Sequence, residues 1–250
     1  EYDALGNLRS VTQPDGTVIE YVVDGRGRRV GKKVDGTPVK GWLYADQLRI
    51  VAELDGVGAV ISRFVYGSKA NVPDYMVRGG VTYRIVSDHL GSPRVILNAD
   101  TGEVVQRMDF DPFGVVRQDT NPGFQPFGFA GGLYDTDTSL VRFGARDYDG
   151  VPGRWTAKDP IGPGAGVNLL SYGRNDPNNF VDADGLTVRV ANPPAGGKNP
   201  YESARDYLMQ DPGMARIITE LEKPEAGDTW IYLNDQRDNR ADTRGKRVMW

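Results

Sequence analysis

Cysteine is absent from the 250 residues, so the chain can form neither a disulfide nor a cysteine nucleophile. The one histidine, His89, cannot alone supply a multi-histidine zinc site or complete a catalytic triad. No apolar run approaches the roughly 18 residues of a membrane-spanning helix, and no signal-peptide pattern is present. The net charge of −4 argues against nucleic acid or an anionic membrane as the main partner.

Glycine and proline are abundant, with 32 and 16 residues, and 39% of the chain is hydrophobic. This composition can build a core, and it favours many short strands joined by tight turns over long helices. The first 63 residues repeat one unit, an alternating apolar strand followed by an Asp-Gly or Gly-Asn turn. A repeat of about 20 residues predicts stacked β-hairpins.

Further strand patterns continue to residue 128 and are separated by turns rich in aspartate and glycine. They cover residues 42–44, 48–54, 61–66, 81–87, 94–97 and 104–110. Residues 1–145 are therefore predicted to be mainly antiparallel strands, with helix concentrated after Thr187. For His89 we expect a role in ordering a turn, because no serine or cysteine nucleophile accompanies it.

Residues 153–186 combine four aspartates with glycines, prolines and an apolar run, which a solvated linker would not need. A folded and partly buried segment is expected there. Two carboxylates that share a site can cleave an amide, because their repulsion keeps one protonated as an acid while the other acts as a base. By spacing alone, aspartates before proline or glycine are turn formers. The four aspartates of residues 153–186 to which these two interpretations apply are Asp159, Asp176, Asp182 and Asp184.

Several motifs stand in the order that is typical of Rhs/YD-repeat polymorphic toxins, and the chain resembles that family over residues 1–186. They are Y-D-x-x-G-N-L from Tyr2, D-H-L-G-S-P-R from Asp88, F-D-P-F-G from Phe110, A-R-D-Y-D from Ala145, D-P-I-G from Asp159 and V-D-A-D-G-L from Val181. The last motif departs from the family's D-P-x-G-L only at Ala183, where proline is usual.

The resemblance implies a mainly β fold in three parts. YD-repeat hairpins would spiral into a cocoon-like shell over residues 1–145, an Rhs core with autoprotease activity would form a plug over 146–186, and a small α+β toxin segment would begin at 187. Family members enclose their own toxin domain in such a shell and cut the chain after the leucine of the last motif. Here that bond joins Leu186 and Thr187.

The resemblance also implies which residues cut the chain. The carboxylates carried over are Asp159, Asp182 and Asp147, with Arg146 as the charge that keeps one of them ionised. The remaining aspartates of residues 153–186, Asp176 and Asp184, are expected to be turn residues. No metal or other cofactor is expected within this segment.

Residues 187–250 are expected to begin the toxin. Helices are predicted at 201–209 and 211–223, and strands at 230–233 and 247–250. This order resembles the start of Rhs-linked zinc metallopeptidase toxins, whose H-E-x-x-H helix and zinc would lie beyond Trp250. Because the chain starts inside a repeat and stops inside an apparent strand, it is expected to be part of a longer polypeptide.

Other passengers and another class of protein remain open. A nuclease, a deaminase or an ADP-ribosyltransferase could take the place of the peptidase. The resemblance implies a secreted protein, delivered into target cells by a specialised system such as type VI secretion in interbacterial competition. A secretion spike or adaptor and a cognate immunity protein are the implied partners. The rival is a non-enzymatic cell-surface YD-repeat protein, in which Asp182 only forms a turn.

Overall fold

The structure is a computed structural model that describes residues 1–69, 71–162, 168–191, 230–232 and 247–249. The chain divides into two compact units, Glu1–Ala191 and Asn192–Trp250. In the second unit, the described residues form β18 (Trp230–Tyr232) and β19 (Arg247–Met249), which pair in parallel. The helices predicted at 201–209 and 211–223 lie outside the described residues. Within those residues, no helix has the length and apolarity needed to cross a membrane.

The first unit is built on an antiparallel sheet of 11 strands, each paired with its neighbours in sequence. This arrangement confirms the predicted series of hairpins. The strands are β1 (Ser10–Thr12), β2 (Val18–Val23), β3 (Arg29–Val34), β4 (Thr37–Tyr44), β5 (Ile50–Asp55), β6 (Val60–Val65), β7 (Tyr75–Arg78), β8 (Val81–Ser87), β9 (Pro93–Asn98), β10 (Val104–Phe110) and β11 (Val116–Asp119). Two of these strands, β7 and β11, had no sequence prediction; the four residues of β7 lie between a proline and a Gly-Gly turn.

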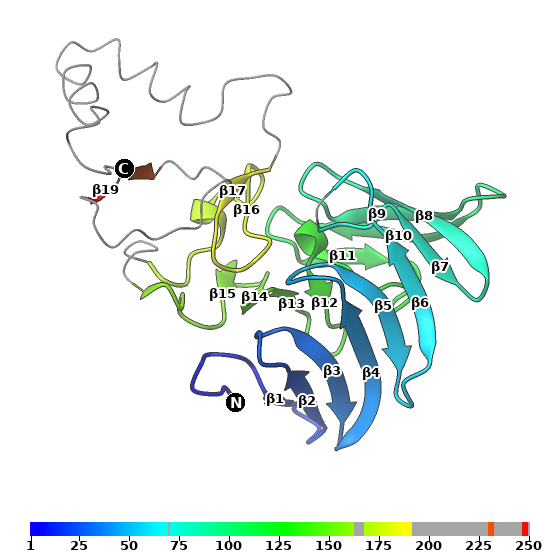
Figure 1. Ribbon diagram of the computed structural model, residues 1–250, viewed down its shortest axis with the longest axis horizontal. Helices are drawn as coiled ribbons and strands as arrows, with labels where there is room; N and C mark the ends of the chain where they lie inside the picture. Colours follow the sequence, from blue (N-terminus) through cyan, green and yellow to red (C-terminus); the bar gives the residue numbers. More distant parts are fainter. Residues whose placement is uncertain (70, 163–167, 192–229, 233–246, 250) are drawn as a thin grey trace, which may run out of the picture. The chain divides into compact units, whose positions relative to one another are not determined.

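A second, smaller sheet lies inside the curl of the first, as Figure 1 shows. It consists of β12 (Leu133–Tyr134), β13 (Leu140–Phe143), β14 (Arg146–Asp149) and β15 (Arg154–Trp155). Two short 3-10 turns, η1 (Phe129–Gly131) and η3 (Gly173–Asn175), and a hairpin of β16 (Phe180–Val181) with β17 (Arg189–Val190) complete the unit. The described part of the chain is thus mainly β.

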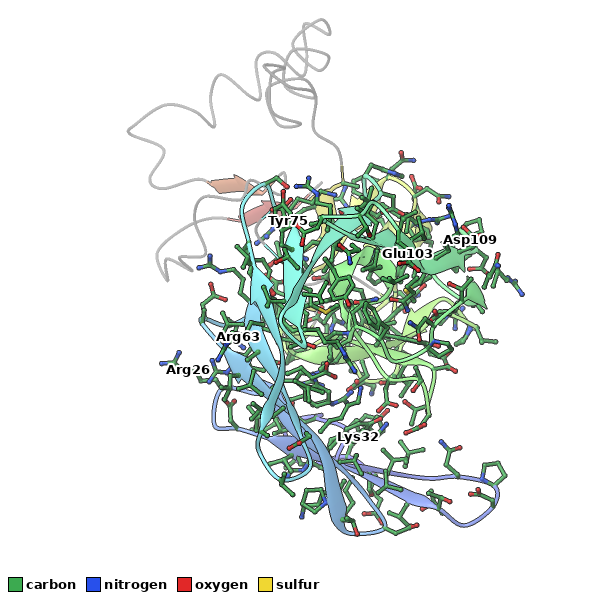
Figure 2. All side chains as sticks on the ribbon, turned by 90° about the vertical axis from the view of Figure 1, so that its right-hand side faces the viewer. Arg26, Lys32, Arg63, Tyr75, Glu103 and Asp109 are labelled. Carbon is green, nitrogen blue, oxygen red and sulfur yellow. The ribbon has the colours of Figure 1, made fainter. Side chains whose placement is uncertain are left out.

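The inner face of the large sheet packs against the smaller elements. Trp42, Phe64 and Met76 are buried against Phe127 and Leu133, and the rings of Phe64 and Phe127 meet edge to face at 4.9 Å. In the view of Figure 2, Arg26 and Arg63 project from the outer side of the large sheet, whereas Lys32 lies on the side of the small sheet. Burial of the aromatic and aliphatic side chains around Phe64 and Phe127 is the main stabilising term for the packing of the large sheet on these elements.

An aromatic cluster fixes the small sheet and the segment that follows it. Phe143, Tyr148, Trp155 and Tyr172 are all buried together with Phe129. The rings of Tyr148 and Tyr172 lie 4.4 Å apart, and Trp155 meets Phe143 edge to face at 5.8 Å. Because these rings come from β13, β14, β15 and the start of η3, the turn between β13 and β14 stands on a rigid base.

The recurring Asp-Gly pattern has a common local structure, which Asp24 illustrates. Its Oδ1 accepts hydrogen bonds from the amides of Arg26 and Arg28, at 2.9 and 3.0 Å. The amide of Gly27, at a φ of +76°, donates to the Asp24 carbonyl at 3.0 Å. A left-handed residue closes each turn, which explains the glycine three positions after the aspartate. The same pattern begins at Asp3, Asp55, Asp88 and Asp111.

Candidate functional site

The D-A-D-G-L segment forms the loop between β16 and β17. It uses a variant of the repeated turn: the Gly185 amide faces the Asp182 carbonyl at 3.4 Å, and the Leu186 amide donates to Asp182 Oδ1 at 2.9 Å. The loop docks on the turn between β13 and β14, where the Ala145 amide donates to the Asp184 carbonyl at 3.0 Å. The bond between Leu186 and Thr187 therefore lies in a loop that is anchored at several points.

Two glycines allow this docking, because the two turns meet backbone to backbone. A Cβ on Gly144, whose φ is +44°, would lie 2.4 Å from the Asp184 carbonyl oxygen. A Cβ on Gly185, whose φ is +71°, would lie 2.5 Å from the Phe143 carbonyl oxygen. Neither site has room for a side chain, so the glycine of D-A-D-G-L is needed for contact as well as for the turn.

Gly144→Ala is expected to loosen the loop. The new methyl group would displace Asp184 and weaken the hydrogen bond from Ala145, at a cost of about 1–3 kcal/mol for overpacking. Amide hydrogen exchange at Ala145 should therefore quicken by roughly tenfold or more. Gly16→Ala is the matched control, since Gly16 also has a positive φ but its Cβ would meet nothing within 4 Å. Equal exchange in both variants would contradict the close contact.

Asp182 is the central side chain of the loop. It is 1% exposed, and its Oδ1 accepts hydrogen bonds from the amides of Leu186 and Thr187, both at 2.9 Å. Burial, aided by a hydrogen bond and by charge repulsion from Asp184, raises the pKa of Asp182 to about 7. In the exposed turn at Asp24, hydrogen bonds and the charge of Arg28 outweigh desolvation and lower the pKa of the aspartate. The aspartate pKa is therefore raised in the buried turn at Asp182 and lowered in the related, more exposed turn at Asp24.

Arg146 on β14 links two of the carboxylates. Its Nη2 lies 2.8 Å from Asp159 Oδ2 and 3.2 Å from Asp182 Oδ2, and its Nε donates to the Gly185 carbonyl. The guanidinium group stacks on Trp155, 4.2 Å from the ring centroid. Burial lowers the pKa of Arg146, while the neighbouring carboxylates act in the opposite direction. The structure thus brings Arg146, Asp159 and Asp182 together beside the predicted cut.

Asp184, predicted from the sequence to be only a turn residue, also joins this cluster. Its Oδ1 accepts hydrogen bonds from the amides of Leu186 and Thr187, at 2.9 and 2.8 Å. Its Oδ2 lies 3.5 Å from Arg189 on β17. The sequence contained one signal for this role of Asp184, its position two residues after Asp182. That spacing did not reveal that both carboxylates turn toward the same amides.

Asp147 lies elsewhere, because successive residues of a strand point to opposite faces. Its Oδ1 accepts from Arg29 of β3 at 2.7 Å and its Oδ2 from Arg142 of β13 at 2.9 Å. Its carboxylate thus pairs with two arginines, and it does not join Arg146 at the loop. Asp176, expected to be a turn residue, hydrogen-bonds Asn179 at 2.9 Å. His89 lies in the turn after β8, and its Nε2 is 2.9 Å from the Asn178 carbonyl oxygen.

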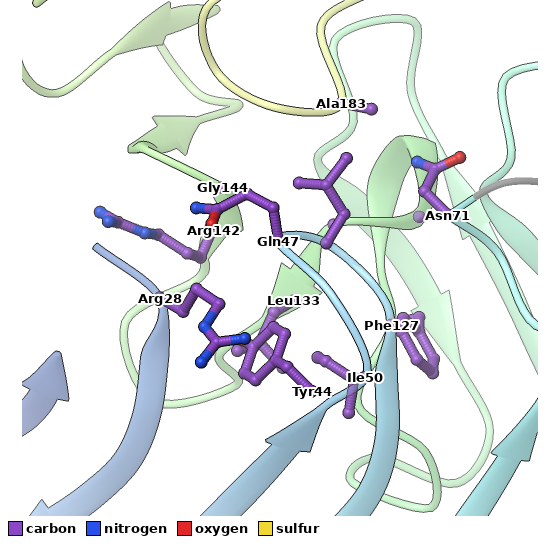
Figure 3. Close-up of a pocket in the computed structure, with 13 residues that line it drawn as sticks. Arg28, Tyr44, Gln47, Ile50, Asn71, Phe127, Leu133, Arg142, Gly144 and Ala183 are labelled. Atoms are coloured by element: carbon purple, nitrogen blue, oxygen red, sulfur yellow. The ribbon is translucent and has the colours of Figure 1, made fainter. Parts of the chain in front are cut away.

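A narrow cavity adjoins the loop on the side of the large sheet. Its volume is about 30 Å³, and Ala183 and Gly144 line it together with Arg28, Gln47 and Asn71 (Figure 3). This space suits about one water molecule, and its polar walls offer hydrogen bonds to it. In the described residues, no group of three or more histidine, cysteine or acidic side chains could hold a metal ion.

The hairpins pair in sequence order, curl around a smaller sheet and are followed by a loop with a buried aspartate. This arrangement defines a β-shell of the YD-repeat class. The model of the family described as Teneurin YD-shell matches residues 1–163, and the chain belongs to this family. The resemblance to Rhs/YD-shell proteins is thereby confirmed.

Relatives of two kinds share this shell. Teneurin-1 of Gallus gallus is 34% identical over 161 residues, which are 62% of this chain and 6% of that protein. The tRNA3(Ser)-specific nuclease WapA of Bacillus spizizenii is 26% identical over 196 residues, 75% of this chain and 8% of that protein. The chain thus spans less than a tenth of the length of these curated relatives.

Solved structures show the same fold. A TcdB2–TccC3 structure covers 74% of this chain at 22% identity with a TM-score of 0.56, over 10% of its own length. The Tc holotoxin pore of Photorhabdus luminescens covers 80% of this chain at 20% identity, also with a TM-score of 0.56 and over 10% of its own length. These matches support the shell fold that the sequence predicted.

Proposed function

We propose that this chain is the C-terminal part of an Rhs toxin shell that cuts itself between Leu186 and Thr187. One observation carries the proposal: the Thr187 amide nitrogen is hydrogen-bonded to two carboxylates, at 2.9 Å from Asp182 and 2.8 Å from Asp184. Two carboxylates beside one peptide bond, Asp182 buried and Asp184 half-buried, form an arrangement that separates an acid from a base.

Asp182 is suited to be the general acid. Its pKa of about 7 leaves a large protonated fraction at neutral pH, and its Oδ1, which accepts the Thr187 N–H in the intact chain, lies close enough to deliver a proton to that nitrogen as the bond breaks. When the bond between the Leu186 carbonyl carbon and Thr187 nitrogen breaks, the proton of Asp182 passes to that nitrogen. A positioned acid of this kind typically contributes about 10²–10⁴ in rate.

An ionised carboxylate would take a proton from the attacking water. Asp159, which the sequence motifs singled out together with Asp182, is a candidate for this base because Arg146 holds it next to Asp182. Asp184 is the second candidate, since it already reaches the scissile amide. The water oxygen adds to the Leu186 carbonyl carbon, and the products are a Leu186 carboxylate and a Thr187 amine.

Arg146 would position the acid and hold the loop. Its Nη2 holds the carboxylates of Asp182 and Asp159 next to each other, and its hydrogen bond to the Gly185 carbonyl holds the loop against β14. Asp147 has no role at the bond in this mechanism, because its carboxylate is paired with Arg29 and Arg142.

The shell would enclose its own toxin domain, and the cut would free this domain from the shell. We further propose that the protein is a secreted effector that reaches target cells through a specialised system such as type VI secretion. Its partners would be a secretion spike or adaptor and an immunity protein. A zinc metallopeptidase remains the first candidate passenger, with its zinc site beyond Trp250. A nuclease is the second, favoured by the name of the WapA relative.

The rival function is a non-enzymatic cell-surface YD-repeat protein. The two proposals differ in the covalent state of the chain. A surface shell would keep residues 186 and 187 joined, whereas the toxin shell would give two fragments. Intact mass under denaturing conditions distinguishes these outcomes directly.

Cleavage is expected to slow as pH rises. The proton on Asp182 is required, and it is lost as pH passes about 7, so the rate should fall about tenfold for each further pH unit. Uncut chain isolated in denaturant can be diluted into buffers of different pH and followed by mass. Equal final folding, checked by circular dichroism, is the control. A rate that increases steadily from neutral to alkaline pH would refute Asp182 as the acid.

A further inference from the structure

We propose that Asp182 and Asp184 form a binding site for the new α-amino group of Thr187, which keeps the cut chain attached to the shell. This inference rests on the proposed cleavage and concerns what happens after it. The ligand atom is already in the site, since the Thr187 nitrogen lies 2.9 Å from Asp182 Oδ1 and 2.8 Å from Asp184 Oδ1.

Cleavage strengthens these contacts because it changes the nitrogen and leaves its neighbours in place. Before the cut, the nitrogen is an amide with one N–H. After the cut and the uptake of a proton, it is an ammonium group with three N–H donors and a positive charge. The two short bonds already end on carboxylate oxygens, and the cut adds a positive charge on the donor, so each becomes an ion pair as well as a hydrogen bond.

The residues after the cut have their own attachment, so the amine does not depend on the broken bond for its position. In the β16–β17 pair, Val181 faces Arg189 and Phe180 faces Val190. The Ala191 amide also donates to the Asn179 carbonyl at 2.8 Å. β17 and the Ala191 amide therefore hold this segment on β16 by backbone pairing, and an added strand is a recurrent way in which proteins hold a peptide.

The charge of the surroundings also favours a cation at this position. Three carboxylates face the loop, those of Asp159, Asp182 and Asp184, and two guanidinium groups oppose them, Arg146 of β14 and Arg189 of β17. The ammonium group offsets this excess. The new carboxylate belongs to Leu186, which is 36% exposed and can turn to solvent.

The test measures the reactivity of the Thr187 amine in the cut, native full-length preparation. A trace of acetic anhydride is added over a range of pH, and acetylation of that amine is read by mass. An ordinary α-amino group has a pKa of about 7.7–8.0. We expect a value at least about one unit higher, so that labelling at neutral pH is roughly tenfold slower than in denatured chain.

The variant Asp184→Asn should restore most of the labelling, and Asp176→Asn should leave it slow, because Asp176 contacts Asn179 and not the loop. If Asp184→Asn is not cut, the pH profile of the unaltered chain still decides the question. An ordinary amine pKa in a cut native chain would overturn this inference alone. A chain that is not cut would overturn the proposed function and this inference with it.

Discussion

Asp182→Asn is expected to leave the chain in one piece. Asparagine keeps the size of the side chain and can still accept the amides of Leu186 and Thr187, but it has no acidic proton for the leaving nitrogen. Loss of that proton should slow the cut by about 10²–10⁴. The measurement is intact mass of the purified chain, with folding confirmed by circular dichroism.

Three further variants make this result specific. Asp159→Asn should also remain uncut if Asp159 is the base, whereas Asp184→Asn should remain uncut if Asp184 has that role. Asp176→Asn is the matched control and should be cut fully, since it has the same chemistry on an exposed turn. Complete cleavage of folded Asp182→Asn would show that the buried loop is structural and that any cut has another cause.

Asp147→Asn is expected to destabilise the shell by about 3–5 kcal/mol, the usual cost of leaving buried charges without their partner. Asp147 is 1% exposed and is the carboxylate that pairs with both Arg29 and Arg142. Its replacement leaves two buried guanidinium groups with no negative charge between them. Urea unfolding in the uncut Asp182→Asn background would measure the loss on a single covalent chain.

Asp109→Asn is the control for this prediction. Asp109 pairs with Arg94 at the surface, and such exposed pairs contribute about 0–1 kcal/mol. Cleavage in the Asp147→Asn single variant gives a second result. If the folded fraction is still cut, Asp147 supports the structure; if it is stable but uncut, Asp147 takes part in the chemistry and the placement of its carboxylate changes during the reaction.

The sequence could predict the hairpins because their signal is local. Alternating apolar residues and Asp-Gly turns determine each strand independently of the rest, as in β8 and β10. The four residues of β7 have too little alternation to identify them, and their strand state depends on pairing with β6 and β8. Pairing across a sheet is a tertiary property that a short segment does not encode.

The site could be predicted in part for a similar reason. Family motifs singled out Asp159, Asp182 and Arg146, and the fold brings these three side chains together. Asp147 was grouped with them because it belongs to the A-R-D-Y-D motif, but the two-residue period of β14 places it on the opposite face from Arg146. Asp184 was overlooked because only the docked loop directs its carboxylate to the Thr187 amide.

For the proposed cut, the alternation along β14 would also set an order of events. Arg146 faces the loop, and its neighbour Asp147 faces Arg29 of β3, which is 118 residues away in sequence. A nascent chain in which β3 has not yet closed over β14 lacks that partner, so the strand carrying Arg146 is held less firmly. The cut would then occur only after the shell has closed. Adjacent residues of one strand would thus couple cleavage to completion of the shell, and the enclosed domain would stay covalently attached until then.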